Sequence, residues 1–410
     1  MPKSSVFTGQ PILTQLLSLI PRSLVSQLAQ KHKADHYCKK FKTYDHLATM
    51  LFCGFHQCSS LRELVTGLLA NAHRLLHLGM RHAPKRSTLA DANRRRPAAL
   101  FEELFHALHR LHYGTLPDSR MEGKLYDRLF VMDSTTVTLF CDVLKGAGTY
   151  GLNGRKKGGI KAHMLTRVKD QVPCFVHLTS AATSDRTFMP MIDLPTGSII
   201  SMDKAYVNYT VMKGWTEKGI TWVTRLTSAM RYEEQAQNLI TEYHSANGVV
   251  SDTVIVLGNP KTESRAPRQN ARLIRYFDKE KNREFKFLCN NFHYSPLTIA
   301  ELYRRRWHIE LLFKRIKQNF QFNNFLGDSE NAIKIQMWCT LIADLLIQII
   351  KDKVDRIRKR KWSFANVAGL IRLHLTTYID LVKFLLEPDS AIIKYARPPD
   401  DQLRLFKAYN

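Results

Sequence analysis

Three acidic residues stand at positions from which their carboxylates could act together. Asp133 ends the apolar run LFVMD, Asp203 ends the run IISMD, and Glu310 lies in ELYRRRWHIELLFKRIKQNF, residues 301–320. A carboxylate at the end of a buried strand is unfavourable unless a cation or several donors meet it. Three carboxylates that share two Mg²⁺ or Mn²⁺ ions form a site for phosphodiester chemistry, in which one ion activates a water or a 3′-hydroxyl and the other stabilises the leaving oxygen.

The segment around Glu310 has the periodicity of a helix with a polar stripe and an apolar face. At about 100° per residue, one continuous helix puts six side chains on a single stripe: Tyr303, Arg306, Trp307, Glu310, Lys314 and Lys317. A second face is apolar and should anchor the helix to a core: Leu302, Ile309, Leu312, Phe313 and Ile316. The stripe therefore has two possible roles. It could line a groove for a polyanion, with Glu310 as a metal ligand, or it could be a solvated helix face with ion pairs at i,i+4 spacing.

Each acid also has a simpler interpretation. Asp133 and Asp203 could cap turns, which is a common role for aspartate after a strand. Glu310 could pair with Arg306 and Lys314 at i,i+4 spacing on a solvated helix. The charge of the whole chain favours the groove. The chain has 410 residues, with 61 Lys and Arg against 36 Asp and Glu, and its net charge of +25 indicates a nucleic-acid partner.

The composition also bears on the cellular compartment. The seven cysteines are scattered and odd in number, which is typical of reduced thiols in a cytoplasmic protein. The N-terminus has no apolar stretch typical of a signal peptide. The longest apolar run, MWCTLIADLLIQII, is interrupted by Asp344 and Gln348, so we expect no membrane partner.

The elements that must position the acids change in type along the chain. Residues 1–120 are predicted to be helical, with Ser60 and Glu63 in a capping-box pattern, and to form a DNA-binding region. Residues 125–227 and 293–326 alternate strands and helices in the order expected of a mixed α/β, ribonuclease-H-like catalytic core. A β-rich insertion, 228–292, interrupts this core, and residues 327–410 form a helical C-terminal region.

The spacing of the helix stripe resembles a family signature. Tyr303, Arg306, Glu310 and Lys317 match the Y-(2)-R-(3)-E-(6)-K pattern of bacterial insertion-sequence DDE transposases of the insertion-sequence-4 family. MDKAY, residues 202–206, is similar to that family's second-aspartate pattern, and FVMDSTTVTL is similar to its first-aspartate strand. The resemblance covers roughly residues 125–350, and KRSTLADANRRR in the N-terminal part also looks related.

The resemblance implies a ribonuclease-H-like domain that moves a DNA element by metal-dependent cleavage and strand transfer. Its implied metal ligands and catalytic residues are Asp133, Asp203 and Glu310, with two ions of Mg²⁺ or Mn²⁺. The implied DNA contacts are Tyr303, Arg306, Trp307, Lys314 and Lys317. The implied partners are double-stranded DNA, namely the terminal inverted repeats and the target, and a second copy of the chain in a homodimeric synaptic complex.

Two other classes of protein fit parts of this pattern. A regulatory or catalytically decayed DNA-binding protein would share the charge, but it would be expected to lose one acid of the triad, and all three are present. A ribonuclease-H-like nuclease without strand transfer would share the acids. The long helical N-terminal region and the basic C-terminal helices favour specific binding of DNA ends over general cleavage.

Overall fold

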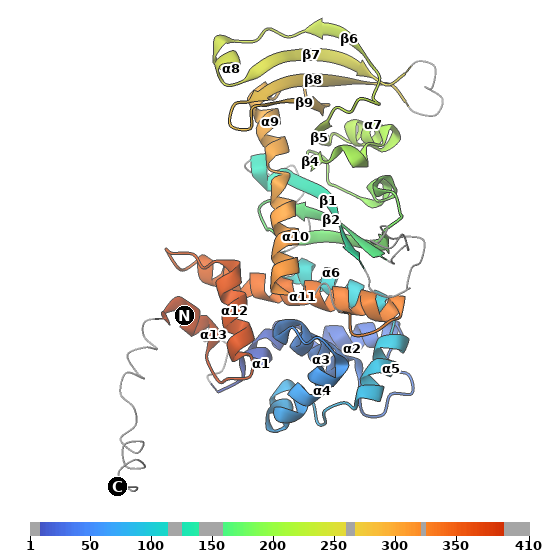
Figure 1. Ribbon diagram of the computed structural model, residues 1–410, viewed down its shortest axis with the longest axis vertical. Helices are drawn as coiled ribbons and strands as arrows, with labels where there is room; N and C mark the ends of the chain where they lie inside the picture. Colours follow the sequence, from blue (N-terminus) through green and yellow to red (C-terminus); the bar gives the residue numbers. More distant parts are fainter. Residues whose placement is uncertain (1–8, 114–124, 139–158, 260–266, 321–324, 389–410) are drawn as a thin grey trace, which may run out of the picture. The chain divides into compact units, whose positions relative to one another are not determined.

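A computed structural model describes residues 9–113, 125–138, 159–259, 267–320 and 325–388 of the chain (Figure 1). The chain divides into two compact units. Unit 1 consists of Met1–Phe105 and Ile316–Asn410, and unit 2 consists of His106–Arg315. Helices α6, Ala98–Tyr113, and α10, Trp307–Asn319, each contain one of the two boundaries.

Unit 1 is helical in the part that the structure describes. Its helices are α1 (Ile12–Leu17), α2 (Arg22–Lys31), α3 (Thr43–His56), α4 (Leu61–Ala70), η1 (Ala72–Leu78), α5 (Arg86–Arg95), α11 (Glu330–Asp355), α12 (Phe364–His374) and α13 (Leu381–Leu386). Helix α11 contacts α3, α5, α12 and α13 and supplies the centre of the core. Unit 1 therefore joins the two ends of the chain in one helical body.

Helix α11 is apolar around most of its circumference, which is the pattern of a helix enclosed by protein. By length and composition it could cross a membrane, but 89% of its most apolar window is buried inside the protein. Among the described residues no other helix meets the same criteria. The burial of α11 is that of a core helix.

The first helices follow the local signals in the sequence. Ser60 caps α4, because its side chain accepts a hydrogen bond from the backbone N–H of Glu63. Arg96, directly after α5, is buried; its guanidinium donates to the Phe41 carbonyl and lies 3.4 Å from Asp35 Oδ1. The basic cluster RRR at the end of α5 is thus divided, with Arg94 and Arg95 exposed and Arg96 holding the fold together.

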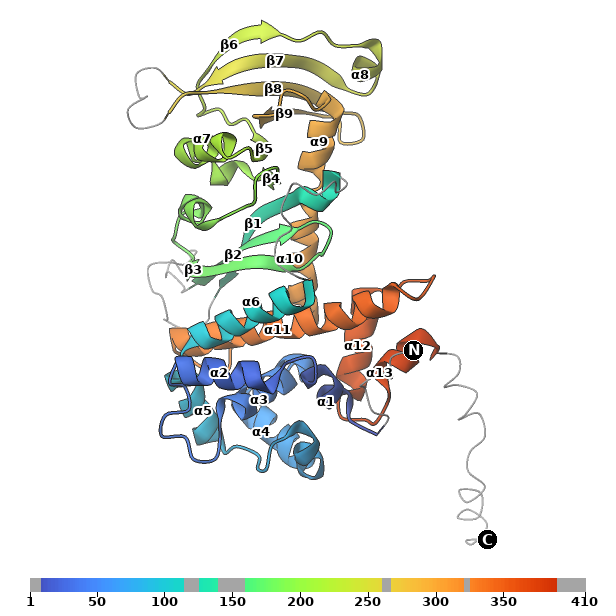
Figure 2. The same ribbon diagram turned by 180° about the vertical axis from the view of Figure 1, so that it is seen from behind.

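Unit 2 is built on one nine-stranded mixed sheet (Figures 1 and 2). The strands are β1 (Leu129–Thr138), β2 (Gly159–Arg167), β3 (Pro173–Ser180), β4 (Ile199–Met202), β5 (Thr221–Arg225), β6 (Tyr232–Gln237), β7 (Val249–Leu257), β8 (Gln269–Asp278) and β9 (Arg283–Cys289). Their order is β3-β2-β1-β4-β5-β9-β8-β7-β6. β1, β2 and β3 pair antiparallel, whereas β1, β4 and β5 pair parallel.

The two faces of this sheet have different neighbours. Strand residues alternate between faces, and one face carries Met132 and Met202 into a core closed by helix α7, Tyr209–Glu217, and by short 3₁₀ turns. These turns are η3 (Asp185–Thr187), η4 (Met189–Met191) and η5 (Lys204–Tyr206). Helix α9, Pro296–Arg304, contacts β4, β5, β7 and β9.

Strands β6 to β9 extend the same sheet instead of forming a separate one, because β9 pairs antiparallel with β5. Helices η2, Leu125–Arg128, and α8, Glu242–Ala246, complete the elements of unit 2. A buried ion pair joins β7 to β8, with Arg272 Nε 2.7 Å from Asp252 Oδ1. Arg272 also donates to the Tyr294 carbonyl, immediately before the N-cap of α9. This pair fixes the start of α9 to the added strands.

The segment expected to be one helix over 301–320 is two helices. Helix α9 ends at Arg304, α10 begins at Trp307, and Arg305 and Arg306 lie in the turn between them. Through this turn the backbone bonds tighten to i→i+3, as from Arg306 N–H to Tyr303 O. The segment contains neither Pro nor Gly, and the turn accompanies a contact of Arg306 with β1, which a local pattern cannot reveal.

Candidate active site

The two aspartates lie at the same level of adjacent parallel strands. In the pairing of β1 with β4, Met132 stands opposite Met202, and this is the last pair of the register. Asp133 and Asp203 are each the next residue. Since neighbouring strands lie about 4.8 Å apart, the two carboxylates start from neighbouring points of the sheet. Only Asp203 lies at a strand end as predicted, because β1 continues past Asp133 to Thr138 through its pairing with β2.

Glu310 is joined to Asp133 by an arginine. Arg306 Nη1 lies 2.8 Å from Asp133 Oδ2, and its Nη2 lies 2.5 Å from Glu310 Oε1. The Arg306–Glu310 pair has the i,i+4 spacing of a surface ion pair, yet the same guanidinium also reaches a strand 173 residues away. Only 13% of the Arg306 side chain is exposed, so this contact is a partly buried bridge.

Asp203 has a different cation. Arg225 Nη2, at the end of β5, lies 3.0 Å from Asp203 Oδ1. Asp203 also caps the turn η5, because its Oδ2 accepts from the N–H of Ala205 at 3.4 Å. Asp203 therefore caps a turn, as the simpler interpretation expected, and also pairs with Arg225.

The two aspartates differ in pKa. Burial raises the pKa of Asp133 to about 6, and the charges of Asp203 and Glu310 act in the same direction, against the Ser134 N–H and Arg306. Burial would also raise the pKa of Asp203, but the hydrogen bond and charge of Arg225 outweigh it and hold that pKa below its ordinary value. Asp133 is therefore the acid whose charge is less fully compensated.

Asp133, Asp203 and Glu310 are chemically suited to bind a divalent cation. All three acids offer carboxylate oxygens, the ligands that Mg²⁺ and Mn²⁺ prefer, and the mutual repulsion at Asp133 is what a bound cation would relieve. Within the described ranges no three His, Cys, Asp or Glu side chains are grouped closely enough to share an ion. Arg306 lies between two of the acids, so a metal shared by Asp133 and Glu310 requires its guanidinium to move aside.

The remaining residues of the stripe have unequal environments. Tyr303 is buried, its ring packs 5.1 Å from Phe287, and the guanidinium of Arg225 lies 5.5 Å from its ring centre. Trp307 is 58% exposed. Lys314 and Lys317 are exposed on α10. The apolar face predicted for this segment is buried as expected: Leu302, Ile309, Leu312, Phe313 and Ile316.

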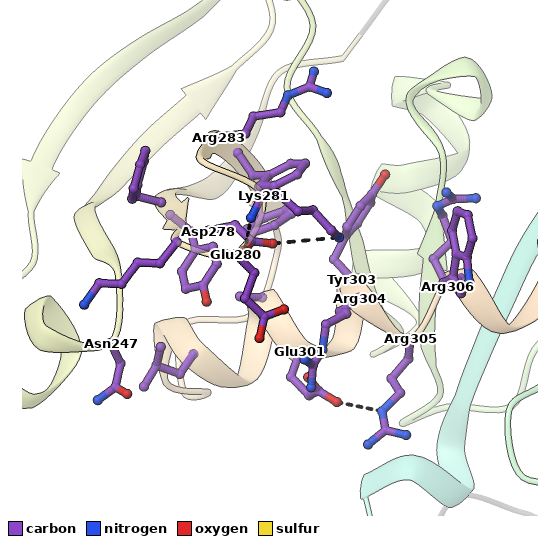
Figure 3. Close-up of a pocket in the computed structure, with 18 of the residues that line it drawn as sticks. Asn247, Asp278, Glu280, Lys281, Arg283, Glu301, Tyr303, Arg304, Arg305 and Arg306 are labelled. Carbon is purple, nitrogen blue, oxygen red and sulfur yellow. Dashed lines mark hydrogen bonds and ion pairs between the residues drawn. The ribbon is translucent and has the colours of Figure 1, made fainter.

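A pocket of about 1110 Å³ opens beside these residues in unit 2 (Figure 3). It runs from the β8–β9 turn to the junction of α9 and α10, and Figure 3 shows Asn247 at one end and Arg306 at the other. Its cations are Arg225, Lys279, Lys281, Arg283, Arg304, Arg305 and Arg306, and its aromatic residues are Tyr276, Phe277, Phe285, Phe287, Tyr303 and Trp307. Two of these cations, Arg225 and Arg306, also hold the acids of the site.

Several of these residues were not singled out from the sequence. Arg225 is the last residue of β5, and the sequence alone gives no sign that this strand ends there beside Asp203. Phe285 carries two cations over its ring, Lys281 at 5.9 Å and Arg283 at 5.5 Å. Their approach to the α9–α10 junction depends on the pairing of β9 with β5, which joins distant parts of the chain.

Comparison with known proteins assigns the family. Residues 126–346 match the family described as "Transposase DDE domain", and residues 8–81 match "Domain of unknown function (DUF4372)". The first match covers more than half of the chain and contains all three acids. The chain belongs to the DDE transposase family.

Individual relatives agree with this assignment. The chain is 32% identical over 269 residues to "Putative transposase y4zB" of Sinorhizobium fredii, a match that covers 65% of this chain and 72% of the relative. It is 25% identical over 241 residues to "Probable transposase for insertion sequence element IS5377" of Geobacillus stearothermophilus, covering 58% and 60%.

Among solved structures, the chain is similar to one described as "Cryo-EM structure of piggyBac transposase synaptic complex with hairpin DNA (SNHP)". The TM-score is 0.46 and the sequence identity is 11%, over 91% of this chain and 79% of that one.

Proposed function

We propose that this chain is a transposase of the insertion-sequence-4 family, with a ribonuclease-H-like core, that binds terminal inverted repeats and catalyses strand cleavage and strand transfer. The observation that carries the proposal is the arrangement of three acids from separate elements around two arginines, Arg225 and Arg306. Asp133 and Asp203 follow the same residue pair in parallel strands, and Arg306 joins Asp133 to Glu310. The strand order β3-β2-β1-β4-β5 supports the ribonuclease-H-like assignment.

Asp133, Asp203 and Glu310 would hold two Mg²⁺ or Mn²⁺ ions. When bound, such ions activate the attacking oxygen and stabilise the leaving oxygen of a phosphodiester. The chain's own groups position the DNA. Arg225 and Arg306 can move from the carboxylates to phosphate oxygens, because a guanidinium binds both kinds of anion in the same bidentate geometry.

The DNA contacts of this proposal follow the stripe and the pocket. Arg306, Lys314 and Lys317 would contact phosphates, Tyr303 would contribute its hydroxyl, and Trp307 offers an exposed ring on which a base can stack. The basic and aromatic residues of the pocket beside Arg306 give a path for DNA that leaves the site. Stacking on such a ring contributes about 1–3 kcal/mol per base.

The other parts of the chain complete the proposal. Residues 1–120 would recognise the repeat sequence, 125–227 with 293–326 would form the catalytic core, 228–292 would be a β insertion, and 327–410 would be a helical C-terminal region. The partners would be double-stranded DNA, as terminal repeats and as target, and a second copy of the chain in the synaptic complex. The protein would act in the cytoplasm, without a membrane.

The direct test is cleavage of a duplex that carries the inverted repeat read from the DNA flanking the coding region. The parental protein should cut it with Mg²⁺ or Mn²⁺, whereas Asp133→Asn, Asp203→Asn and Glu310→Gln should bind it and leave it intact. Each amide keeps the shape of the side chain and removes the charge that a cation needs. Cutting by Asp203→Asn at the parental rate would refute the assignment.

The same reaction separates a transposase from a nuclease. When a supercoiled target plasmid is added, the cut repeat end should become joined to the plasmid, because the 3′-hydroxyl released by cleavage is the nucleophile of the joining step. Cut ends without joined products would identify a nuclease. Binding of the duplex with neither reaction would identify a DNA-binding protein without catalytic activity.

A further inference from the structure

A second polar cluster lies behind the acids, on the opposite face of β1. Because side chains alternate along a strand, Asp133 faces Arg306 while Ser134 faces the other way. We call the group that meets there the far-face cluster. It consists of Ser134 on β1, Lys161 and His163 on β2, Asp185 in η3 and Tyr206 in η5.

Asp185 is the centre of this cluster. Its Oδ1 accepts a hydrogen bond from Ser134 Oγ at 3.0 Å and lies 3.2 Å from Lys161 Nζ and 3.5 Å from His163 Nδ1. Lys161 also donates to the Thr183 carbonyl at 2.9 Å. The β1–β2 register places Ser134 opposite His163, so two cross-strand partners and a 3₁₀ turn meet at one carboxylate.

Tyr206 connects this centre to the second aspartate. Its hydroxyl lies 3.4 Å from His163 Nδ1, the same ring nitrogen that lies 3.5 Å from Asp185 Oδ1. His163 Nε2 is in turn 2.9 Å from Thr179 Oγ1 on β3. His163 and Tyr206 are almost completely buried, and the ring of Phe188 stacks on His163. A buried network with these partners allows few alternative arrangements.

The cluster touches both strands that carry the aspartates. The Ser134 N–H donates to Asp133 Oδ1 at 2.8 Å, so the residue held by Asp185 also holds the first acid. Tyr206 ends the turn η5 that Asp203 caps. The contacts from Ser134 through Asp185 and His163 to Tyr206 therefore link the backbones that carry Asp133 and Asp203, on the side of the sheet away from the reacting groups.

We infer that the far-face cluster is a positioning network that sets the separation of the Asp133 and Asp203 carboxylates, and so the affinity of the site for its divalent ions. The inference rests on the proposed function. Asp185, Ser134 and Tyr206 are positioning residues, because they act through the two aspartates. Partners of metal ligands in this role typically change metal affinity by about 10–100-fold when they are altered.

The test is Mn²⁺ binding to the full-length protein, measured by the loss of the free Mn²⁺ signal in electron paramagnetic resonance. Tyr206→Phe removes one hydroxyl and keeps the ring in the core, and Asp185→Asn removes one charge and keeps the shape. Both should weaken Mn²⁺ binding about tenfold, and thermal melting should show that they remain folded. Tyr209→Phe, a half-buried tyrosine three residues further on, is the matched control and should bind as the parent does.

A second readout separates positioning from general damage. In repeat-end cleavage, the Mg²⁺ concentration for half-maximal rate should rise about tenfold in Tyr206→Phe, while the rate at saturating Mg²⁺ approaches the parental rate. A variant that was merely less well folded would instead lose maximal rate at every Mg²⁺ concentration. That result, or parental Mn²⁺ affinity in both variants, would overturn the inference.

The outcome also shows which of the two proposals has failed. Asp203→Asn removes a proposed ligand itself and should bind Mn²⁺ more weakly than Tyr206→Phe. If the parent and Asp203→Asn differ but the cluster variants match the parent, the metal site stands and the positioning network is wrong. If the parental protein binds no Mn²⁺ at all, the proposed function and the inference drawn from it are both refuted.

Discussion

At the scale of single residues, the guanidinium of Arg306 holds together acids that belong to different elements. It is both the cation that compensates Asp133 and Glu310 and a group that a bound metal must displace from between them. Removing Arg306 should therefore favour metal binding and slow DNA cleavage. These opposite effects distinguish a DNA-binding groove from a solvated helix face that carries only i,i+4 ion pairs.

We expect Arg306→Ala to cut repeat-end DNA at least about tenfold more slowly, because a phosphate contact beside the reacting bond is lost. Binding of Mn²⁺ should be equal to or tighter than that of the parent, because two carboxylates lose a competing cation. Single-turnover cleavage and Mn²⁺ titration measure the two effects. The matched control is Arg275→Ala, which removes an arginine–carboxylate pair with Glu284 on the exposed side of β8.

Lys317→Ala should also slow end-specific cleavage, since the exposed ammonium is proposed to contact a phosphate. A ladder of helix surface pairs predicts something else for both variants, namely a loss of about 0.2–0.5 kcal/mol of helix stability per pair and unchanged cleavage. If Arg306→Ala and Lys317→Ala both cut DNA at the parental rate and melt at slightly lower temperatures, the proposal that these residues line a DNA-binding groove is wrong.

His46 in unit 1 makes the stability of the protein depend on pH. Its Nε2 lies 2.7 Å from Asn93 Oδ1, whereas Nδ1 is buried without a hydrogen-bond partner. Burial lowers the pKa of His46 to about 3, with Arg96 acting in the same direction. Because the unfolded chain takes up this proton near pH 6.5 and the folded chain does not, the stability due to neutral His46 is present above pH 6.5 and is lost as the pH falls toward 3.

We expect this loss to approach about 1.4 kcal/mol per pH unit below pH 6. Urea unfolding of the parent and of His46→Gln at pH 7 and pH 5 measures it, and the variant should show the smaller difference between the two pH values. His36→Gln, at an exposed histidine of the same unit, should behave as the parent does. Equal pH dependence in the parent and His46→Gln would contradict the prediction.

At the scale of elements, the buried pair Arg272–Asp252 connects strands β7 and β8 to the start of α9. Asp252→Asn leaves a buried guanidinium without its counter-charge and should cost about 3–5 kcal/mol of unfolding free energy. The double change Asp252→Leu with Arg272→Met should recover part of that loss, because no unpaired charge remains. Arg275→Ala, which breaks the exposed pair next to it, should cost at most about 1 kcal/mol.

Urea unfolding of the parent, Asp252→Asn, the double variant and Arg275→Ala measures these differences in unfolding free energy. If Asp252→Asn lost no more stability than Arg275→Ala, the pair would not hold these elements together. The prediction also extends to the active site, since Arg272 holds the carbonyl of Tyr294 directly before α9, and α9 leads to Arg306. Asp252→Asn should accordingly slow cleavage even where it remains folded.

The elements that the sequence predicted well are those with a local pattern. The apolar runs before Asp133 and Asp203 became, respectively, the first half of β1 and strand β4. What the sequence could not reveal depends on the order of strands in the sheet. Arg225 meets Asp203 only because β5 lies beside β4, and the far-face cluster needs β1, β2 and two 3₁₀ turns at one point.

The helix break at Arg305 and Arg306 has the same origin. Every residue from 301 to 320 is compatible with a helix, so periodicity predicted a continuous one. The observed turn coincides with the contact between Arg306 and Asp133, which is separated from it by 173 residues. Local propensity is a weak constraint where a partly buried ion pair competes with it.

At the scale of the whole molecule, the net charge of +25 should make DNA binding strongly dependent on salt. The logarithm of affinity should fall by about 0.9 per phosphate neutralised for each tenfold rise in salt. Arg86 and Arg94 are exposed on α5, so removing both in the full-length chain should reduce this slope by about 2 if each contacts a phosphate.

Fluorescence anisotropy of labelled repeat DNA at several salt concentrations measures the slope. Lys31→Ala, whose ammonium already pairs with Glu103, is the control and should leave it unchanged. An unchanged slope in the Arg86→Ala, Arg94→Ala protein would show that α5 does not contact DNA. Arg96 is unsuitable for this test, because its side chain is buried against Asp35 and Phe41.

The composition of unit 1 from both ends of the chain has a consequence for protein synthesis. Helices α3 and α5 contact α11, which leaves the ribosome more than half of the chain length later. At ordinary rates of translation this delay lasts roughly tens of seconds. During that time the surfaces of α3 and α5 that α11 covers lack that helix, whereas all of unit 2 has already been made. A prematurely terminated chain can therefore contain every acid of the active site and still lack the helix that completes unit 1.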